Sequence, residues 1–130
     1  MEKAILYAED DPELRKSMEK TLNLYIQRVL GIEAEVLVAK DGTEALKIIE
    51  ESHDKLVAVV TDFNMPGANG FQVYEAASAH DIPTMILSGR LREDLPTGDY
   101  TYLGKGSPVS EIGDWLKACF DKVRGVKAES

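Results

Sequence analysis

The stretch Leu56-Val57-Ala58-Val59-Val60 decides the fold class of this chain. It is continuously apolar and rich in β-branched residues, which is typical of a strand in a parallel sheet covered on both faces. On either side of it, short apolar runs alternate with amphipathic stretches of helical period. This alternation predicts an α/β protein in which helices connect the strands of a parallel sheet and lie on both of its faces.

Four further apolar runs predict strands, and four amphipathic stretches predict helices. The strands are expected at residues 4–8, 35–39, 84–87 and 100–103, and the helices at residues 12–30, 43–51, 71–79 and 108–123. Asp11 as N-cap and Pro12 as the first helical residue mark the start of the first helix, and Gly31 marks its end. We assign Asp11 to this capping role alone.

Composition restricts the classes of function. The 130 residues carry a formal net charge of −8, which argues against direct binding to nucleic acid or to an anionic membrane. The chain contains no apolar run near the ~20 residues of a membrane span, and we expect no signal peptide. The single Cys119 excludes an internal disulfide and favours a cytoplasmic location. We expect one domain over residues 1–125 and a disordered tail over residues 126–130.

Polar side chains follow four of the predicted strands. Glu9 and Asp10 follow the first strand, Asp62 the third, Ser88 the fourth and Lys105 the fifth. In a parallel sheet these positions share one edge, where open α/β sheets bind their ligands. Clustered carboxylates tolerate one another when a cation joins them, and an all-oxygen site with room for water suits Mg²⁺. The sequence therefore predicts a Mg²⁺ site in which a carboxylate can accept a phosphoryl group.

Five motifs, in register along essentially the whole chain, carry a resemblance to a known family. The stretch VTDFNMPGANG at residues 60–70 resembles the phosphoacceptor segment of response-regulator receiver domains. The stretches at residues 5–12, 41–46, 87–89 and 102–105 resemble that family's first-strand acids, second-helix entry and fourth- and fifth-strand signatures. The resemblance implies a flavodoxin-like, doubly wound sheet with strand order 2-1-3-4-5.

The resemblance also implies a phosphorylated aspartate and the residues that bind its metal ion. Asp62 is the expected phosphoacceptor, and it is also expected to be a ligand of Mg²⁺. Asp10 is expected to bind Mg²⁺ directly and Glu9 to act through water or a longer reach. The backbone carbonyl of Asn64 is the remaining expected ligand.

Further residues are expected to read the phosphate. By the resemblance, Ser88 donates a hydrogen bond to the phosphoryl group, Lys105 pairs with it, and Tyr102 turns inward when Ser88 shifts. Arg90 is a further candidate for contact with the phosphate. The implied phosphoryl donor is a phosphohistidine on a sensor histidine kinase or a histidine phosphotransfer protein. The implied output is a change in binding to a downstream partner protein, with no enzyme activity beyond phosphorylation and dephosphorylation at Asp62.

The chain departs from the family pattern in three places, and this leaves alternatives open. Its first helix is expected to be longer than usual by about two turns of ~3.6 residues each. The segment between Ser88 and Lys105 predicts a short or missing fourth helix, and Gly106 stands where most receivers have proline. Ser107 is expected to cap the last helix, with Pro108 opening it. A pseudo-receiver that binds partners without cycling phosphate is one alternative. An aspartyl-phosphate phosphatase is another, although Asn64 stands where such enzymes place their acid.

Overall fold

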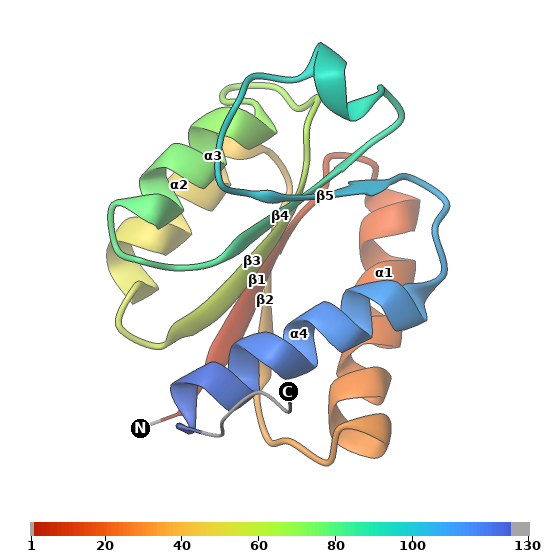
Figure 1. The fold of residues 1–130 in the computed structure, drawn as a ribbon, viewed down its shortest axis with the longest axis vertical. Coiled ribbons are helices and arrows are strands. Elements are labelled where there is room, and N and C mark those ends of the chain that lie inside the picture. The colour runs from red at the N-terminus through yellow and green to blue at the C-terminus, as the bar shows by residue number, and fades with distance from the viewer. Residues whose placement is uncertain (1, 126–130) are drawn as a thin grey trace.

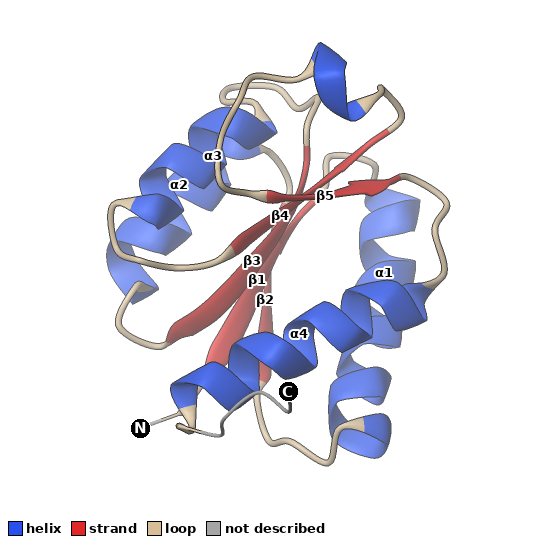
Figure 2. Ribbon diagram, viewed as in Figure 1, coloured by secondary structure: helices blue, strands red, loops and turns tan. Residues whose placement is uncertain are grey.

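The computed structural model describes residues 2–125, so the tail predicted at residues 126–130 lies outside the described residues. Five parallel strands form one sheet in the order β2-β1-β3-β4-β5 (Figures 1 and 2). This confirms the predicted α/β class and strand order. The strands are β1 (Ala4–Ala8), β2 (Glu35–Ala39), β3 (Leu56–Asp62), β4 (Thr84–Ser88) and β5 (Thr101–Gly104).

Helices cover both faces of the sheet, as expected of a doubly wound fold. Helices α1 (Pro12–Leu24) and α4 (Val109–Val123) pack on one face, and α2 (Gly42–Ser52) and α3 (Gly70–Ser78) on the other (Figure 1). Alternate residues of β1 therefore enter two different cores. Ile5 and Tyr7 pack with α1 and α4, whereas Leu6 packs with α2 and α3. No helix in the described part of the chain is long and apolar enough to cross a membrane.

The central strand β3 accounts for the position of Asp62. It pairs with β1 on one side and β4 on the other, and all seven of its residues are buried. The strand continues two residues beyond its apolar core, through Thr61 to Asp62. A carboxylate is thus held at the C-terminal edge of the sheet by the same strand that anchors the core.

The first helix ends differently from the uninterrupted helix predicted over residues 12–30. The α-helix stops at Leu24, and Tyr25–Val29 wind as a π-helix before Gly31 at φ 65°. The Tyr25 ring packs on Gly113 of α4, where a Cβ atom would lie 2.1 Å from the ring. The local sequence pattern does not reveal this fit, because Gly113 lies in the last helix of the chain.

The last helix is not capped as predicted. Its N-cap is Pro108, which has no side chain able to cap, and Ser107 Oγ instead donates a hydrogen bond of 2.7 Å to the Gly104 carbonyl. Ser107 therefore closes the turn after β5, and the capping prediction is wrong. The predicted N-cap of α1 is confirmed, because the Asp11 carboxylate accepts hydrogen bonds from the backbone N–H groups of Glu13 and Leu14.

The connection from β4 to β5 confirms the prediction of a short fourth helix. Between these strands the structure has only a three-residue 3₁₀-helix, Arg92–Asp94. The Arg92 guanidinium stacks on the Tyr100 ring at 4.4 Å and donates hydrogen bonds to the Tyr100 hydroxyl and the Gly98 carbonyl. Leu95 is buried in the same cluster. An arginine–tyrosine stack and one apolar anchor therefore hold this segment.

Gly42 is expected to be intolerant of any side chain. It begins α2, and a Cβ atom there would lie 1.8 Å from the Ala68 carbonyl oxygen, in the loop that follows Asp62. Gly42→Ala should destabilise the fold by about 3 kcal/mol, because backbone atoms cannot rotate away as a side chain can. Urea unfolding measures this. Gly89→Ala, with open space around its Cβ, is the control. Equal stability of the two variants would contradict the prediction.

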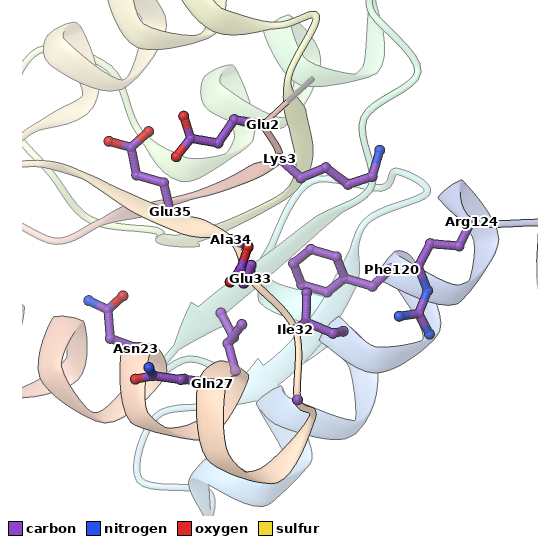
Figure 3. Close-up of a pocket in the computed structure, with 12 residues that line it drawn as sticks. Glu2, Lys3, Asn23, Gln27, Ile32, Glu33, Ala34, Glu35, Phe120 and Arg124 are labelled. Carbon is purple, nitrogen blue, oxygen red and sulfur yellow. The ribbon is translucent and has the colours of Figure 1, made fainter.

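A large open pocket lies away from Asp62, at the N-terminal ends of β1 and β2. It has a volume of about 910 Å³, and Figure 3 shows Lys3, Glu33, Phe120 and Arg124 around it. Its wall carries charges of both signs, from Glu2, Glu33 and Glu35 and from Lys3 and Arg124, so it favours neither an anionic nor a cationic ligand. The residues that the sequence predicts to be functional lie elsewhere.

Candidate functional site

Three carboxylates meet where β1 and β3 end. Glu9 and Asp10 follow β1, Asp62 ends β3, and one oxygen of each lies within 4.8 Å of the other two. The parallel pairing of the two strands brings these ends together, as predicted from sequence. Glu9 and Asp62 are buried, and Asp10 is exposed. The cluster is therefore open to solvent on the Asp10 side.

Asp62 is held in place through both of its carboxylate oxygens. Its Oδ1 accepts a hydrogen bond of 2.8 Å from the backbone N–H of Phe63, and its Oδ2 lies 3.1 Å from Lys105 Nζ. The residue is 5% exposed. The orientation of this carboxylate is thus set before any ligand binds.

Glu9 is more buried than Asp62, at 1% exposure. Its Oε2 accepts a hydrogen bond of 3.1 Å from the backbone N–H of Asp11. Its Oε1 lies 3.4 Å from Lys105 Nζ, without the alignment of a hydrogen bond, and has no hydrogen-bond partner among the described residues. One buried acceptor of the cluster is therefore incompletely satisfied.

The site favours a bound cation. Burial raises the pKa of the Asp62 carboxyl, with Asp10 adding to the effect while Lys105 and the Phe63 N–H oppose it. Burial likewise raises the pKa of Glu9, where Asp62 adds to the effect and the Asp11 N–H and Lys105 oppose it. Burial alone would lower the pKa of Lys105, but its contacts with Asp62 and Glu9 raise it. The single ammonium group does not fully compensate the acids.

Neutralising Asp62 should stabilise the metal-free protein. A carboxyl whose pKa is raised by folding contributes stability below its unfolded-state pKa and loses it as pH rises through its folded-state pKa. We therefore expect Asp62→Asn to unfold at a higher temperature than the unsubstituted chain in EDTA at neutral pH. The difference should shrink as pH falls below the carboxyl pKa. Thermal unfolding across this pH range is the measurement, and a lower melting temperature for the variant at neutral pH would contradict it.

The predicted phosphate-reading residues gather at the ends of β4 and β5. Ser88 is buried at the end of β4, and its Oγ accepts a hydrogen bond of 2.9 Å from the Arg90 N–H. Because a hydroxyl oxygen can accept while its proton remains free, Ser88 can still donate. The Lys105 N–H donates to the Ser88 carbonyl at 2.9 Å, which ties the lysine to β4. Gly106, at φ 90°, forms the turn after Lys105.

Three further predicted residues lie around this group. Tyr102 is half-buried, and its hydroxyl donates to the Arg90 carbonyl. The Arg90 guanidinium lies 5.7 Å from the centroid of the Phe63 ring, beside the residue that follows Asp62. Asn64 is exposed in the loop after β3, two residues from Asp62.

Sequence reasoning missed Arg15. This residue lies in the first turns of α1, and its guanidinium donates hydrogen bonds to the backbone carbonyls of Glu9 at 3.0 Å and Asp10 at 3.4 Å. It thereby holds the acidic turn against the helix. Its spacing from Glu9 and Asp10 is the one available signal, and an exposed helix arginine is too common for that signal to stand out.

The donor set fits a hard divalent cation. The three carboxylates supply oxygen ligands only, which Mg²⁺ prefers. The exposed side of the cluster leaves room for the water molecules that Mg²⁺ usually keeps.

The sequence is similar to those of two-component proteins. A sequence model of the family described as "Response regulator receiver domain" matches residues 5–99, and the match ends before Lys105. The transcriptional regulatory protein PrrA of Mycobacterium bovis is 34% identical over 97% of this chain and 53% of its own length. The two-component response regulator ARR11 of Arabidopsis thaliana is 28% identical over 83% of this chain and 20% of its own length. The chain thus spans about half the length of PrrA.

Solved structures agree in fold. The receiver domain of the hybrid histidine kinase CckA is 29% identical, with a TM-score of 0.67, over 89% of this chain and 97% of that one. The response regulator TrrA of Thermotoga maritima, solved in complex with Mg(2+)-BeF, is 25% identical, with a TM-score of 0.72, over 90% of this chain and 98% of that one. A receiver domain from Clostridium thermocellum, 21% identical with a TM-score of 0.79 over 96% of this chain and 99% of that one, shows the same fold.

Proposed function

This chain belongs to the response regulator receiver domain family, and on that premise we propose that it is a Mg²⁺-dependent switch phosphorylated at Asp62. The observation that supports this most directly is the group around Asp62. Glu9 and Asp10 contribute carboxylate oxygens within 4.8 Å, and Lys105 Nζ lies 3.1 Å from Asp62 Oδ2. A nucleophilic carboxylate, a cation site and an ammonium group are the parts that acyl phosphate formation needs.

Each residue of the site has a separate role in phosphoryl transfer. An Asp62 carboxylate oxygen attacks the phosphorus of a phosphohistidine, the P–N bond breaks, and an acyl phosphate remains on Asp62. Glu9, Asp10, Asp62 and the Asn64 carbonyl would hold Mg²⁺. Bound Mg²⁺ offsets negative charge on the carboxylates and the phosphoryl oxygens. Lys105, whose ammonium group now faces Asp62, would pair with the phosphoryl group bound to Asp62.

The phosphoryl group also provides the switch. It adds about −1.5 to −2 charges at Asp62. The Ser88 hydroxyl, which can still donate its proton, moves to form a hydrogen bond with the phosphoryl group. Lys105 leaves Glu9 and pairs with the phosphoryl group. Tyr102, whose hydroxyl is bonded to the Arg90 carbonyl, is released to turn inward. The population of conformers at β4, β5 and α4 then shifts, and a downstream protein binds differently.

A small phosphodonor tests the proposal directly. The purified chain is incubated with acetyl phosphate, with and without Mg²⁺, and its intact mass is measured. We expect a gain of one phosphoryl group that requires Mg²⁺. No gain from a chain that binds Mg²⁺ would instead favour the pseudo-receiver, which binds partners without cycling phosphate. Steady hydrolysis of a generic phosphomonoester would favour a phosphatase.

Arg90 is expected to lengthen the life of the phosphate. Its side chain lies against Phe63, next to Asp62, and its backbone is tied to Ser88 and Tyr102. Arg90→Ala should speed autodephosphorylation a few-fold, because water gains access once the side chain is removed. The decay of phosphorylated protein after removal of the donor measures this. Arg28→Ala, on the exposed surface of the π-helix, is the control. An unchanged lifetime would contradict the role.

The proposed partners follow from the chemistry. The donor is a sensor histidine kinase or a histidine phosphotransfer protein, and the output is a protein that binds the phosphorylated form. PrrA is a transcriptional regulatory protein, but this chain matches only about half of it. The net charge of −8 supports a protein partner over nucleic acid for this domain. The cytoplasmic location stays a prediction.

A further inference from the structure

A small cavity lies behind Lys105, on the face of the sheet that α1 and α4 cover. It has a volume of about 90 Å³. Its wall is mostly apolar, and Leu14, Met18, Leu103 and Ile112 contribute to it from α1, β5 and α4. This volume exceeds the about 10–15 Å³ that a cavity needs to hold one water molecule, so the cavity has room for water or one small organic molecule.

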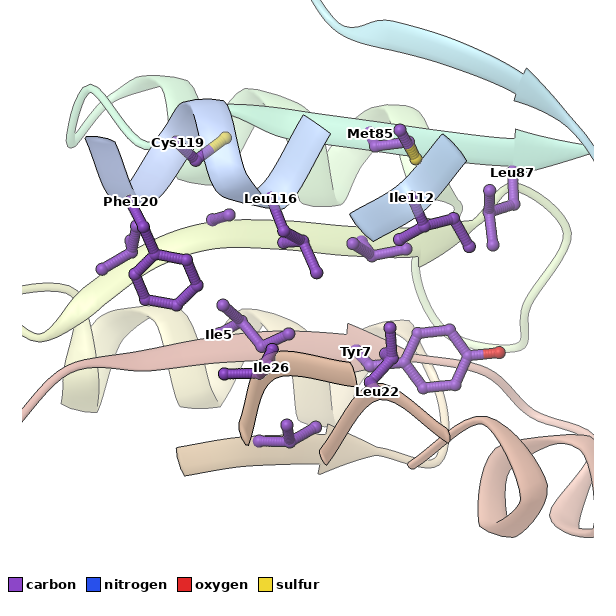
Figure 4. Packing of buried hydrophobic residues seen from close by; sticks show 14 residues of the cluster. Ile5, Tyr7, Leu22, Ile26, Met85, Leu87, Ile112, Leu116, Cys119 and Phe120 are labelled. Carbon is purple, nitrogen blue, oxygen red and sulfur yellow. The ribbon is translucent and has the colours of Figure 1, made fainter. Parts of the chain in front are cut away.

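Four polar residues, Tyr7, Glu9, Lys105 and Ser107, also line the cavity. Two of them have a buried polar atom that lacks a hydrogen-bond partner. One is Glu9, whose Oε1 has no hydrogen-bond partner among the described residues. The other is Tyr7 of β1, which is 0% exposed and whose hydroxyl also lacks a partner within residues 2–125. Figure 4 shows the Tyr7 ring among the core side chains, with its hydroxyl directed toward the C-terminal end of β1.

An unpartnered hydroxyl in a protein interior is costly, and such groups are rare in native structures. A phenol hydroxyl donates one hydrogen bond, and a carboxylate oxygen accepts. These needs are complementary, and one small molecule with a hydroxyl group meets both: it accepts from Tyr7 and donates to Glu9. The apolar remainder of the wall suits a short hydrocarbon body.

We propose that this cavity is a binding site for one small hydroxylic molecule, water or a short-chain alcohol, that links the Tyr7 hydroxyl to Oε1 of Glu9. Tyr7 is then a positioning residue that acts on the carboxylate cluster through the bound molecule. The expected effect of this link on Mg²⁺ binding rests on the proposed function, because that proposal makes Glu9 part of the metal site.

The link matters most when Lys105 moves. In the present structure Lys105 Nζ lies 3.4 Å from Glu9 Oε1 and 3.1 Å from Asp62 Oδ2, so one ammonium serves both acids. When Lys105 turns to a phosphoryl group on Asp62, its ion pair with Glu9 Oε1 is lost. A hydroxyl hydrogen bond from the cavity then keeps the buried carboxylate oriented.

Tyr7→Phe removes the hydroxyl and leaves the ring, so it isolates the link. We expect the dissociation constant for Mg²⁺, measured by titration calorimetry, to rise roughly tenfold, as is typical when an outer partner of a metal ligand is lost. The melting temperature in EDTA should not rise. If the Tyr7 hydroxyl has no partner at all, Tyr7→Phe should instead raise the melting temperature and leave the Mg²⁺ affinity unchanged. That pair of results would overturn the proposal.

Tyr25→Phe is the matched control, because Tyr25 packs between α1 and α4 on the same face, against Gly113. It should leave the Mg²⁺ affinity unchanged, and an equal loss in both variants would overturn the proposal. If the unsubstituted chain binds no Mg²⁺, that result contradicts the proposed function and leaves the cavity to be tested without metal.

A measurement without metal tests the proposed binding of a small molecule in the cavity independently of the proposed function. Crystals of the metal-free chain, grown with and without 2-propanol, should show an oxygen within hydrogen-bond distance of both Tyr7 Oη and Glu9 Oε1. Water in both crystals identifies water as the ligand, and density for 2-propanol identifies an alcohol. Either result supports the site, and a cavity without such an oxygen overturns it.

Discussion

Replacing Asp62 with Asn is expected to abolish phosphorylation of this chain by acetyl phosphate. Asparagine keeps the size of the side chain and can accept the Phe63 N–H, but its amide cannot serve as the nucleophilic carboxylate. It also removes the charge that faces Lys105 Nζ at 3.1 Å. The intact mass of the variant should therefore show no added phosphoryl group under conditions that phosphorylate the unsubstituted chain.

A matched control separates this loss from a general effect of charge. Asp54→Asn removes one exposed carboxylate that lies between α2 and the start of β3, at the opposite end of that strand from Asp62, and should leave phosphorylation unchanged. Unfolding is not the expected cause of the loss at Asp62, because that variant is expected to be the more stable protein without metal, and its melting temperature measures this. A phosphoryl group on the Asn variant would place the acceptor elsewhere and refute the assignment of Asp62.

Replacing Asp10 with Asn is expected to weaken Mg²⁺ binding by at least tenfold. Asp10 is the exposed member of the three-carboxylate cluster, so its ligand oxygen can reach a cation without moving buried groups. An amide oxygen keeps one donor atom but removes a full negative charge from the site. Calorimetric titration with MgCl₂ measures the change, and the rate of phosphorylation by acetyl phosphate at limiting Mg²⁺ should fall with it.

The neighbouring residue supplies an unusually close control. Asp11→Asn removes the same charge one position further on, yet asparagine caps a helix about as well as aspartate does. The N-cap of α1, with its hydrogen bonds to Glu13 and Leu14, should survive. We expect little change in Mg²⁺ affinity. Similar weakening in both variants would mean that Mg²⁺ senses the overall charge of the acidic turn, and that Asp10 is no direct ligand.

Much of the fold was predictable because its signals are local or depend on strand direction. The apolar run at residues 56–60 indicated a buried parallel strand, and β3 is the central, fully buried strand. Once the strands are parallel, the residues that follow them share one edge. Glu9, Asp10, Asp62 and Lys105 could therefore be grouped from sequence, and the structure brings them together.

Details that depend on contacts between distant segments could not be predicted. Ser107 looked like a helix cap, but its hydroxyl bonds to the Gly104 carbonyl in the turn it belongs to. The first helix ends in the π-helix Tyr25–Val29, and the Tyr25 ring packs against Gly113. The sequence around Tyr25 does not indicate this contact, and neither does the sequence around Gly113. Such choices depend on rotamers and on the packing of one helix against another.

The sequence by itself therefore determined the order of the elements, the parallel sheet and the set of acids at its edge, because hydrophobic period and strand polarity are written along the chain. Only the tertiary structure decided how those acids are paired. It placed Lys105 between Asp62 and Glu9, and it directed the hydroxyl of Tyr7, a core residue by its pattern, toward the site edge. The physical reason is that a strand fixes which face a side chain enters, whereas the polar atoms it meets there come from other strands and helices.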